Sequence, residues 1–232
     1  TGGSVGSNRA LLSFANTAAV PGRWANYTTA KIPNFGTATQ TLPASTSSIN
    51  VGSYPAGTTN IVRVQGSNVL NLSGTLQAGT TLIVNTSRTV TITGNITYAR
   101  QTIGSAREAS QLVIAAQNIN IAEAVTEVNG WLIATPTSST AQGVVSTCGS
   151  PASPYYTGLR STNCDKKLTI NGAITARQLQ LRRTAGAEKD NLAAPAEVIN
   201  QRADIFLWAS SFATRSGLEM ETAATMEAAP RF

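Results

Sequence analysis

The chain has 232 residues and a mass of 24.1 kDa, with 41% hydrophobic and only 12% charged residues. This size suits a domain with a sizeable core, and the apolar content excludes wholesale disorder. Histidine is absent, which excludes imidazole-dependent catalytic triads and the commonest metal ligand. No apolar run is long enough to span a bilayer, so we expect no membrane insertion.

An N-terminal segment of low apolar content comes first. Residues 1–55 are mostly Gly, Ser, Thr, Ala and Pro, and their clearest apolar patch contains Leu11, Leu12 and Phe14. Such a segment is either disordered or held by pairing with another surface. We expect an extended arm over 1–55, able to add a strand to a neighbouring molecule, followed by one folded domain over 56–232.

Short alternating segments begin at about residue 60. In them Val, Ile and Leu alternate with Thr, Asn and Gln, a period of two that predicts half-buried β-strands. The segments are 61–66, 69–74, 81–85, 90–96, 111–116, 119–121, 131–134, 168–174 and 179–181.

Three of these segments share the motif apolar-x-apolar-x-Gly-x-apolar, at 70–76, 90–96 and 168–174. The first two copies are 20 residues apart and the third lies 78 further on, close to four such periods. A period of this size predicts an all-β parallel β-helix, or β-solenoid, whose stacked coils bury a ladder of aliphatic side chains. The motif glycines Gly74, Gly94 and Gly172 are expected at its corners, where the backbone turns.

An antiparallel β-sandwich is the alternative fold class. It also produces many short strands separated by turn residues, and Asn129-Gly130 and Asn171-Gly172 could form its hairpin turns.

Cys148 and Cys164 flank fifteen residues rich in Pro, Gly and Ser. This arrangement favours a disulfide over two free thiols, and the bond would contribute about 3 kcal/mol of stability. A disulfide implies an oxidising, exported setting, so we expect an extracellular protein. The chain begins at Thr1, which we interpret as the start of a mature product whose signal has been removed.

The C-terminal region changes in character from about residue 183. Its most apolar stretch, 202–209, contains Ile205, Phe206, Leu207 and Trp208. Because an open solenoid end pairs with other chains unless it is covered, we expect these residues to cap it.

Residues that support catalysis or ion binding are scarce. The chain has three Asp, and the acids of its middle third are Glu108, Glu123 and Glu127. They form no obvious carboxylate pair for glycoside hydrolysis and no cluster for Ca²⁺. The net charge of +6 is spread over mostly isolated basic residues, which argues against nucleic-acid binding. We expect no enzyme activity, no cofactor and no metal; a β-helix polysaccharide lyase using these glutamates is the enzymatic rival.

Residues 85–232 contain a series of short motifs in a characteristic order. It comprises Thr91-Ile-Thr-Gly-Asn-Ile-Thr-Tyr98, Val128-Asn-Gly-Trp-Leu-Ile-Ala134, the two cysteines, Leu179-Gln-Leu-Arg-Arg-Thr-Ala-Gly186, Pro195-Ala-Glu-Val-Ile-Asn200 and Pro230-Arg-Phe232. This region resembles the C-terminal part of large secreted surface proteins of Saccharibacteria-like candidate-phyla bacteria. The resemblance implies a bridged cysteine pair and a natural C-terminus at Phe232, and it supplies no catalytic residues. More distantly, the solenoid is similar to polymer-forming bactofilins.

These observations predict an extracellular structural protein of the cell surface. We expect it to assemble with itself into a filament, pilus-like or matrix-forming, through head-to-tail or strand-addition contacts. The alternative function is a monomeric adhesin or glycan-binding module whose flat Thr/Asn/Gln face binds host-cell or matrix glycans.

Overall fold

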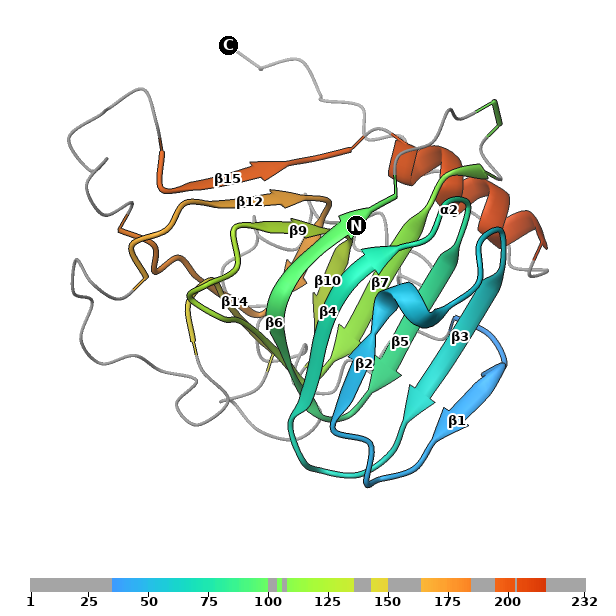
Figure 1. Ribbon diagram of the computed structural model, residues 1–232, viewed down its shortest axis with the longest axis horizontal. Coiled ribbons are helices and arrows are strands. Elements are labelled where there is room, and N and C mark those ends of the chain that lie inside the picture. Colours follow the sequence, from blue (N-terminus) through green and yellow to red (C-terminus); the bar gives the residue numbers. More distant parts are fainter. Residues whose placement is uncertain are drawn as a thin grey trace, which may run out of the picture.

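A computed structural model describes residues 35–99, 104–105, 108–135, 143–149, 164–184, 195–202 and 204–215. The predicted assembly arm residues Leu11, Leu12 and Phe14 lie outside this part of the chain. The described strands wind through successive coils that stack on one another (Figure 1).

Every coil contributes one strand to a six-stranded sheet. All neighbouring strands in this sheet are parallel, and their order in the sheet is their order in the sequence. A sandwich built from hairpins would place antiparallel strands side by side, so this topology confirms the parallel β-helix. The strands are β1 (Gln40–Leu42), β3 (Thr59–Val64), β5 (Thr81–Thr86), β7 (Gln111–Ala116), β10 (Trp131–Ala134) and β13 (Ile174–Ala176).

The remaining strands form a second sheet that forks at β6 (Thr89–Tyr98). The first half of β6 pairs with β8, and the second half pairs with β9 at Ile96. Beyond the fork each coil therefore adds one strand to each branch, and the solenoid changes from two sides to three. Before the fork lie β2 (Ser48–Asn50) and β4 (Leu70–Leu76); one branch is β8 (Asn118–Ile121), β11 (Val144–Ser146) and β14 (Gln178–Gln180); the other is β9 (Glu127–Asn129), β12 (Leu168–Asn171) and β15 (Glu197–Asn200).

The solenoid begins earlier than the predicted domain boundary at residue 56. β1 pairs with β3, β2 pairs with β4, and the 3-10 helix η3 (Val51–Ser53) buries Val51 in the core. The described part of the expected 1–55 arm is thus the first coil. Strands of three residues are too short to show an alternating pattern, which is why the sequence there resembles an unstructured arm.

The middle of the six-stranded sheet is buried on both faces, whereas β3 keeps the half-buried pattern that we expected. The inner face of the sheet contributes to the main core, and its outer face packs against helix α2 (Asp204–Arg215). Every residue of β7 and β10 is buried. Continuous apolar runs such as Leu112–Ala116 are typical of strands covered on both sides.

The predicted cap residues lie in α2, which covers the side of the six-stranded sheet rather than the end of the solenoid (Figure 1). Ile205 and Trp208 are buried against the sheet, whereas Phe206 is 42% and Leu207 62% exposed. The helix lies there because many outward residues of the middle strands, among them Ile83 and Ile133, are apolar and must be covered.

The motif glycines occupy two different places in the coil. Gly74 and Gly94 lie within β4 and β6, whereas Gly172 lies between β12 and β13. Gly74 has a φ of +115°, and the register shifts beside it, so that it pairs with Ile96 rather than Gly94. The expectation of four equal periods between Gly94 and Gly172 is therefore wrong. Gly172 lies only two coils after Gly94, and it lies at the corner between β12 and β13 instead of within a strand.

Coil length varies because loops of different sizes connect the strands. In the six-stranded sheet, paired residues are 22 apart at Val62 and Val84, but 42 apart at Leu132 and Ile174. A short fixed period in the sequence is thus found only in the first coils.

Candidate functional site

Cys148 and Cys164 form a disulfide bond with a Cα–Cα distance of 5.8 Å, and both residues are fully buried. This confirms the predicted pairing. The bond joins Cys148, two residues after the end of β11, to the segment that leads into β12. In the preceding coil only a short turn connects β8 to β9. At the same corner of the next coil the connection from β11 to β12 is longer, and the disulfide bridges it.

Arg183 anchors this corner from the next coil. Its guanidinium donates to the carbonyl oxygens of Ala122, Glu123, Thr147 and Lys166, at 2.9, 2.7, 2.6 and 3.3 Å. Two of these acceptors lie next to or near the disulfide cysteines. One planar group therefore donates to four carbonyl oxygens from three separate segments of the chain.

Burial lowers the pKa of the Arg183 guanidinium, and the nearby carboxylates of Glu197, Glu123 and Asp165 oppose that shift. Glu197 also accepts hydrogen bonds from the backbone N–H groups of Arg182 and Arg183, at 2.9 and 2.6 Å. The charges are thus held in a structural network around the corner.

Arg88 plays the same part near the other end of the solenoid. It is buried, and its guanidinium donates to the carbonyl oxygens of Thr46, Gln65, Asn68 and Val69. Burial lowers its pKa as well. Sequence reasoning missed both arginines, because nothing local distinguishes a buried arginine from the exposed ones around it.

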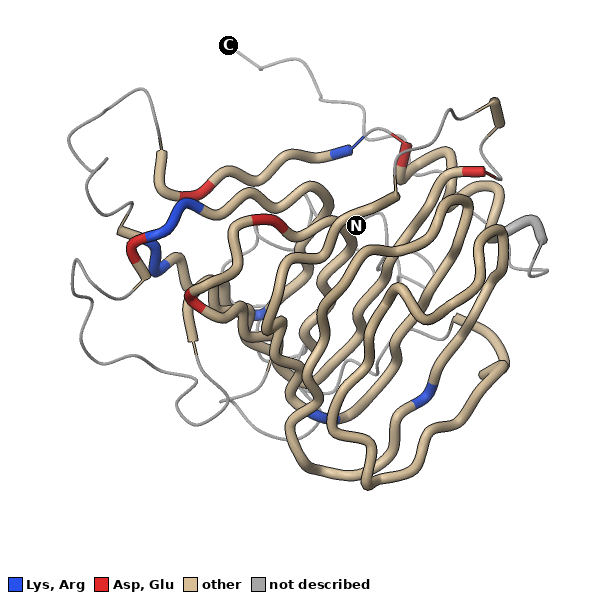
Figure 2. Tube along the Cα trace, viewed as in Figure 1, with Lys and Arg blue, Asp and Glu red and all other residues tan. Residues whose placement is uncertain are grey.

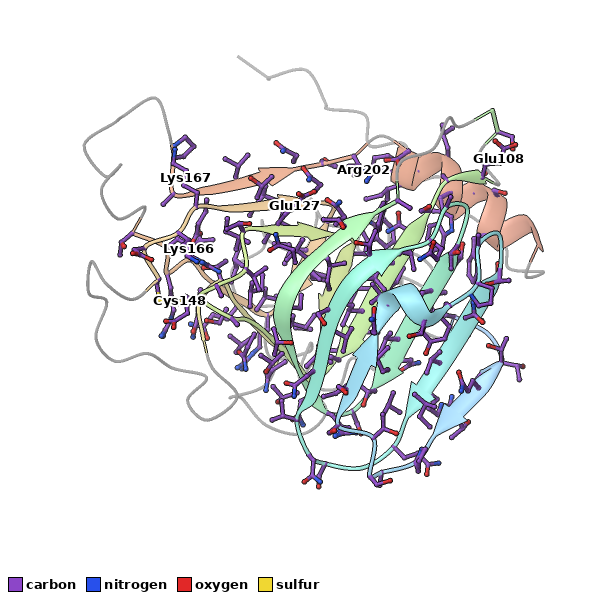
Figure 3. All side chains as sticks on the ribbon, in the orientation of Figure 1. Glu108, Glu127, Cys148, Lys166, Lys167 and Arg202 are labelled. Carbon is purple, nitrogen blue, oxygen red and sulfur yellow. A yellow bond between two sulfur atoms is a disulfide. The ribbon has the colours of Figure 1, made fainter. Side chains whose placement is uncertain are left out.

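Two of the glutamates considered for catalysis accept hydrogen bonds from nearby residues. Glu108 accepts from the backbone N–H of Gly104 and the hydroxyl of Ser105, and Glu127 accepts from the side-chain amide of Asn129. Figure 3 shows Glu108 and Glu127 well apart on the molecule. Over the described residues, no group of three or more Asp, Glu, Cys or His side chains could hold a metal ion. Within the same residues, no helix is long and apolar enough to cross a membrane.

The C-terminal end of the solenoid exposes residues that belong to its core. Leu179 is in register with Val145, and Ile199 with Ile170, both of which are buried in the core. Leu179 is nevertheless 40% exposed and Ile199 44%, because β14 and β15 are the last described strands of their branches. Leu181, which follows β14, is 58% exposed.

The first coil of the described chain carries no charged residue before Arg63. The sequence from Phe35 to Val62 contains no Lys, Arg, Asp or Glu, and the edge strands β1 and β2 contain no proline. Figure 2 shows how sparse charge is over the first coils, and how it gathers at the other end, near β12 and β14. Edge strands of soluble proteins commonly carry charges or prolines that prevent further pairing, and within the described residues β1 and β2 carry neither.

Two open hollows share Arg63 on the first coils. The larger, of about 500 Å³, is lined by Gly36, Thr37, Ala38, Thr41 and Arg63. The smaller, of about 390 Å³, extends from Arg63 along Gln65 to Asn85 and Ser87. Hydroxyl and amide groups thus flank a single exposed guanidinium.

The exposed ends, the first coil and the Arg63 hollows are the features with functional potential that sequence reasoning did not locate. Comparisons with protein-family models, curated proteins and solved structures found no match to this chain.

Proposed function

We propose that this protein is a structural component of an extracellular surface, assembling end to end with copies of itself into a filament. The observation that carries the proposal is the exposure of Leu179 and Ile199, where two rows of core residues end at the C-terminal coil. An uncharged strand edge at the opposite end offers a surface to cover them. A contact between two different ends does not close on itself, so it generates a fibre.

The extracellular part of the proposal rests on the disulfide. Cys148 and Cys164 are bonded and buried, and the described residues contain no free cysteine. Disulfides of this structural kind persist in oxidising compartments. The resemblance to secreted surface proteins points the same way.

The test is negative-stain electron microscopy of the oxidised protein across a concentration series. We expect uniform fibres whose length grows with concentration. The Leu179→Asp variant should shorten or abolish them, because it places a charge in the exposed core row. Leu207→Asp is the matched control, since Leu207 is also exposed but lies on the outer side of α2. Discrete monomers at every concentration would contradict the proposal.

A glycan-binding module is the second candidate function, favoured by the Arg63 hollows. A guanidinium flanked by hydroxyl and amide groups suits a carboxylated or sulfated sugar. A glycan array probed with monomeric protein tests it: acidic glycans should bind, Arg63→Ala should remove the signal, and Lys166→Ala should retain it. No binding by the monomer would exclude this function.

A further inference from the structure

The register of the sheets defines what a further coil would look like. One row of outward-facing residues crosses the six-stranded sheet, and another crosses the second sheet. The first consists of Thr41, Arg63, Asn85, Ala115, Ile133 and Thr175; the second consists of Ser48, Asn71, Thr91, Asn120, Ser146 and Gln180. Each row begins in the first coil and ends in the last.

Two of the three strand edges of the last coil, β13 and β14, match the two edges of the first coil in direction and length, and β15 forms the third side. All neighbouring strands are parallel, so a second copy stacked head to tail presents its first coil with the right polarity. β13 and β14 have three residues each, as do β1 and β2. None of these four strands contains a charged residue or a proline. Pairing them would therefore bury no unpaired charge, and every residue has a backbone N–H to donate to the neighbouring strand.

The side chains at the ends are also suited to stacking. Leu179 and Ile199 are incompletely buried at the last coil, and Leu42 and Tyr54 of the first coil are only partly buried against the core. Stacking would remove these apolar surfaces from water. Thr175 Oγ1 and Gln180 Oε1 are buried within the single chain, and neither has a hydrogen-bond partner there. Elsewhere, similar side chains in successive coils do pair: Thr75 and Thr97 at 2.8 Å, and Asn171 and Asn129 at 2.8 Å.

We infer that the filament contact is a direct continuation of the solenoid. The last coil of one copy pairs with the first coil of a second copy, with β13 beside β1 and β14 beside β2. In this register, Thr175 lies opposite Thr41 of the second copy, and Gln180 lies opposite Ser48 of the second copy. Rotation about their side-chain torsions lets Thr175 and Gln180 reach these hydroxyls. This inference rests on the proposed end-to-end assembly and specifies which strands of the two copies pair. It does not require residues 1–34.

Cysteine cross-linking tests this register. Thr41→Cys and Thr175→Cys are made in separate chains, mixed, and oxidised under conditions in which the native disulfide is intact. We expect a cross-linked dimer from the mixture and none from either variant alone, since the contact joins different ends. Ser48→Cys with Gln180→Cys should behave in the same way. Thr41→Cys with Thr75→Cys is the control, because Thr75 lies on the side of the solenoid.

A charge at the edge provides a second test that leaves the fold intact. Thr41→Lys, at an exposed edge position, should abolish fibres, whereas Thr75→Lys should not. Deleting residues 1–30 should leave both fibres and cross-links, whereas exchange of an N-terminal arm predicts their loss.

The outcomes separate this inference from the proposed function. Fibres without the Thr41–Thr175 cross-link, or fibres lost on deletion of residues 1–30, would overturn the continuous register and leave the filament standing. Absence of both fibres and cross-links would overturn both. Cross-linking of Thr175→Cys with itself would show a symmetric contact and would also overturn the inference.

Discussion

The indole nitrogen of Trp208 donates a hydrogen bond of 2.8 Å to the hydroxyl of Thr81, which lies 127 residues earlier in the chain. Trp208 also packs edge to face on Trp131 and stacks on Phe212, with ring centroids 6.2 and 5.0 Å away. A single side chain thus ties α2 to the outer face of the six-stranded sheet.

Removing this anchor should strongly destabilise the protein. We expect Trp208→Ala to lower the free energy of unfolding by about 3–5 kcal/mol, as for other buried aromatic residues. Thr81→Val, which leaves the indole N–H without its acceptor, should cost about 1–3 kcal/mol. Denaturant unfolding measures both, and Leu207→Ala on the exposed side of α2 is the control, with a change of about 0.5 kcal/mol or less. Equal effects of Trp208→Ala and Leu207→Ala would contradict the packing of α2 on the sheet.

The buried arginines should not be replaceable by lysine. Lysine carries a single ammonium group, which cannot reach the four carbonyl oxygens that Arg183 or Arg88 satisfies. Each of Arg183→Lys and Arg88→Lys should therefore lower the unfolding free energy by about 1–3 kcal/mol or more, since buried carbonyls lose their donors. The exposed Arg63→Lys serves as the control in the same denaturant titration. Wild-type stability in Arg183→Lys would show that the four hydrogen bonds contribute little.

Gly172 should tolerate no side chain. A Cβ at this position would lie 1.9 Å from the carbonyl oxygen of Gly130, so the two coils would have to separate. We expect Gly172→Ala to cost about 1–3 kcal/mol or more, the usual range for overpacking. Gly94→Ala meets only the Ser73 side chain at 3.2 Å and should cost less. Thermal unfolding compares the two, and a larger loss for Gly94→Ala would contradict the close approach at Gly172.

The disulfide should contribute measurably to stability. It closes a loop across a sequence separation of 16, for which loop entropy predicts about 3 kcal/mol. The double variant Cys148→Ser, Cys164→Ser should therefore unfold at a lower denaturant concentration than the oxidised protein. Reduction of the wild type in denaturant, followed by refolding without oxidant, should give the same loss. Identical midpoints for the oxidised and double-variant proteins would show that Arg183 alone holds this corner.

Several parts of the structure follow directly from local sequence patterns. Alternating residues such as those at 90–96 predicted strands, and the repeated glycine motif predicted a parallel β-helix. The Pro-, Gly- and Ser-rich segment between Cys148 and Cys164 favoured a disulfide over two free thiols. These features depend on side-chain period and composition, which are local properties of the chain.

The features of the candidate assembly surface could not be read in the same way. Ile199 is an apolar residue of the kind found in cores, and it is exposed only because β15 is the last strand of its branch. Likewise, Thr41 and Thr175 occupy the first and last places of one row only once four intervening strands are in register. Nothing in the local sequence distinguishes a terminal coil from an internal one.

The sequence by itself favoured a solenoid over a sandwich and a disulfide over two free thiols, because hydrophobic period and residue type act over a few neighbouring positions. Only the tertiary structure decided that α2 covers a face rather than an end, that the second sheet forks at β6, and that Gly172 turns a different corner from Gly74. These features depend on contacts between coils, and connecting loops of unequal length hide the spacing of those contacts in the sequence.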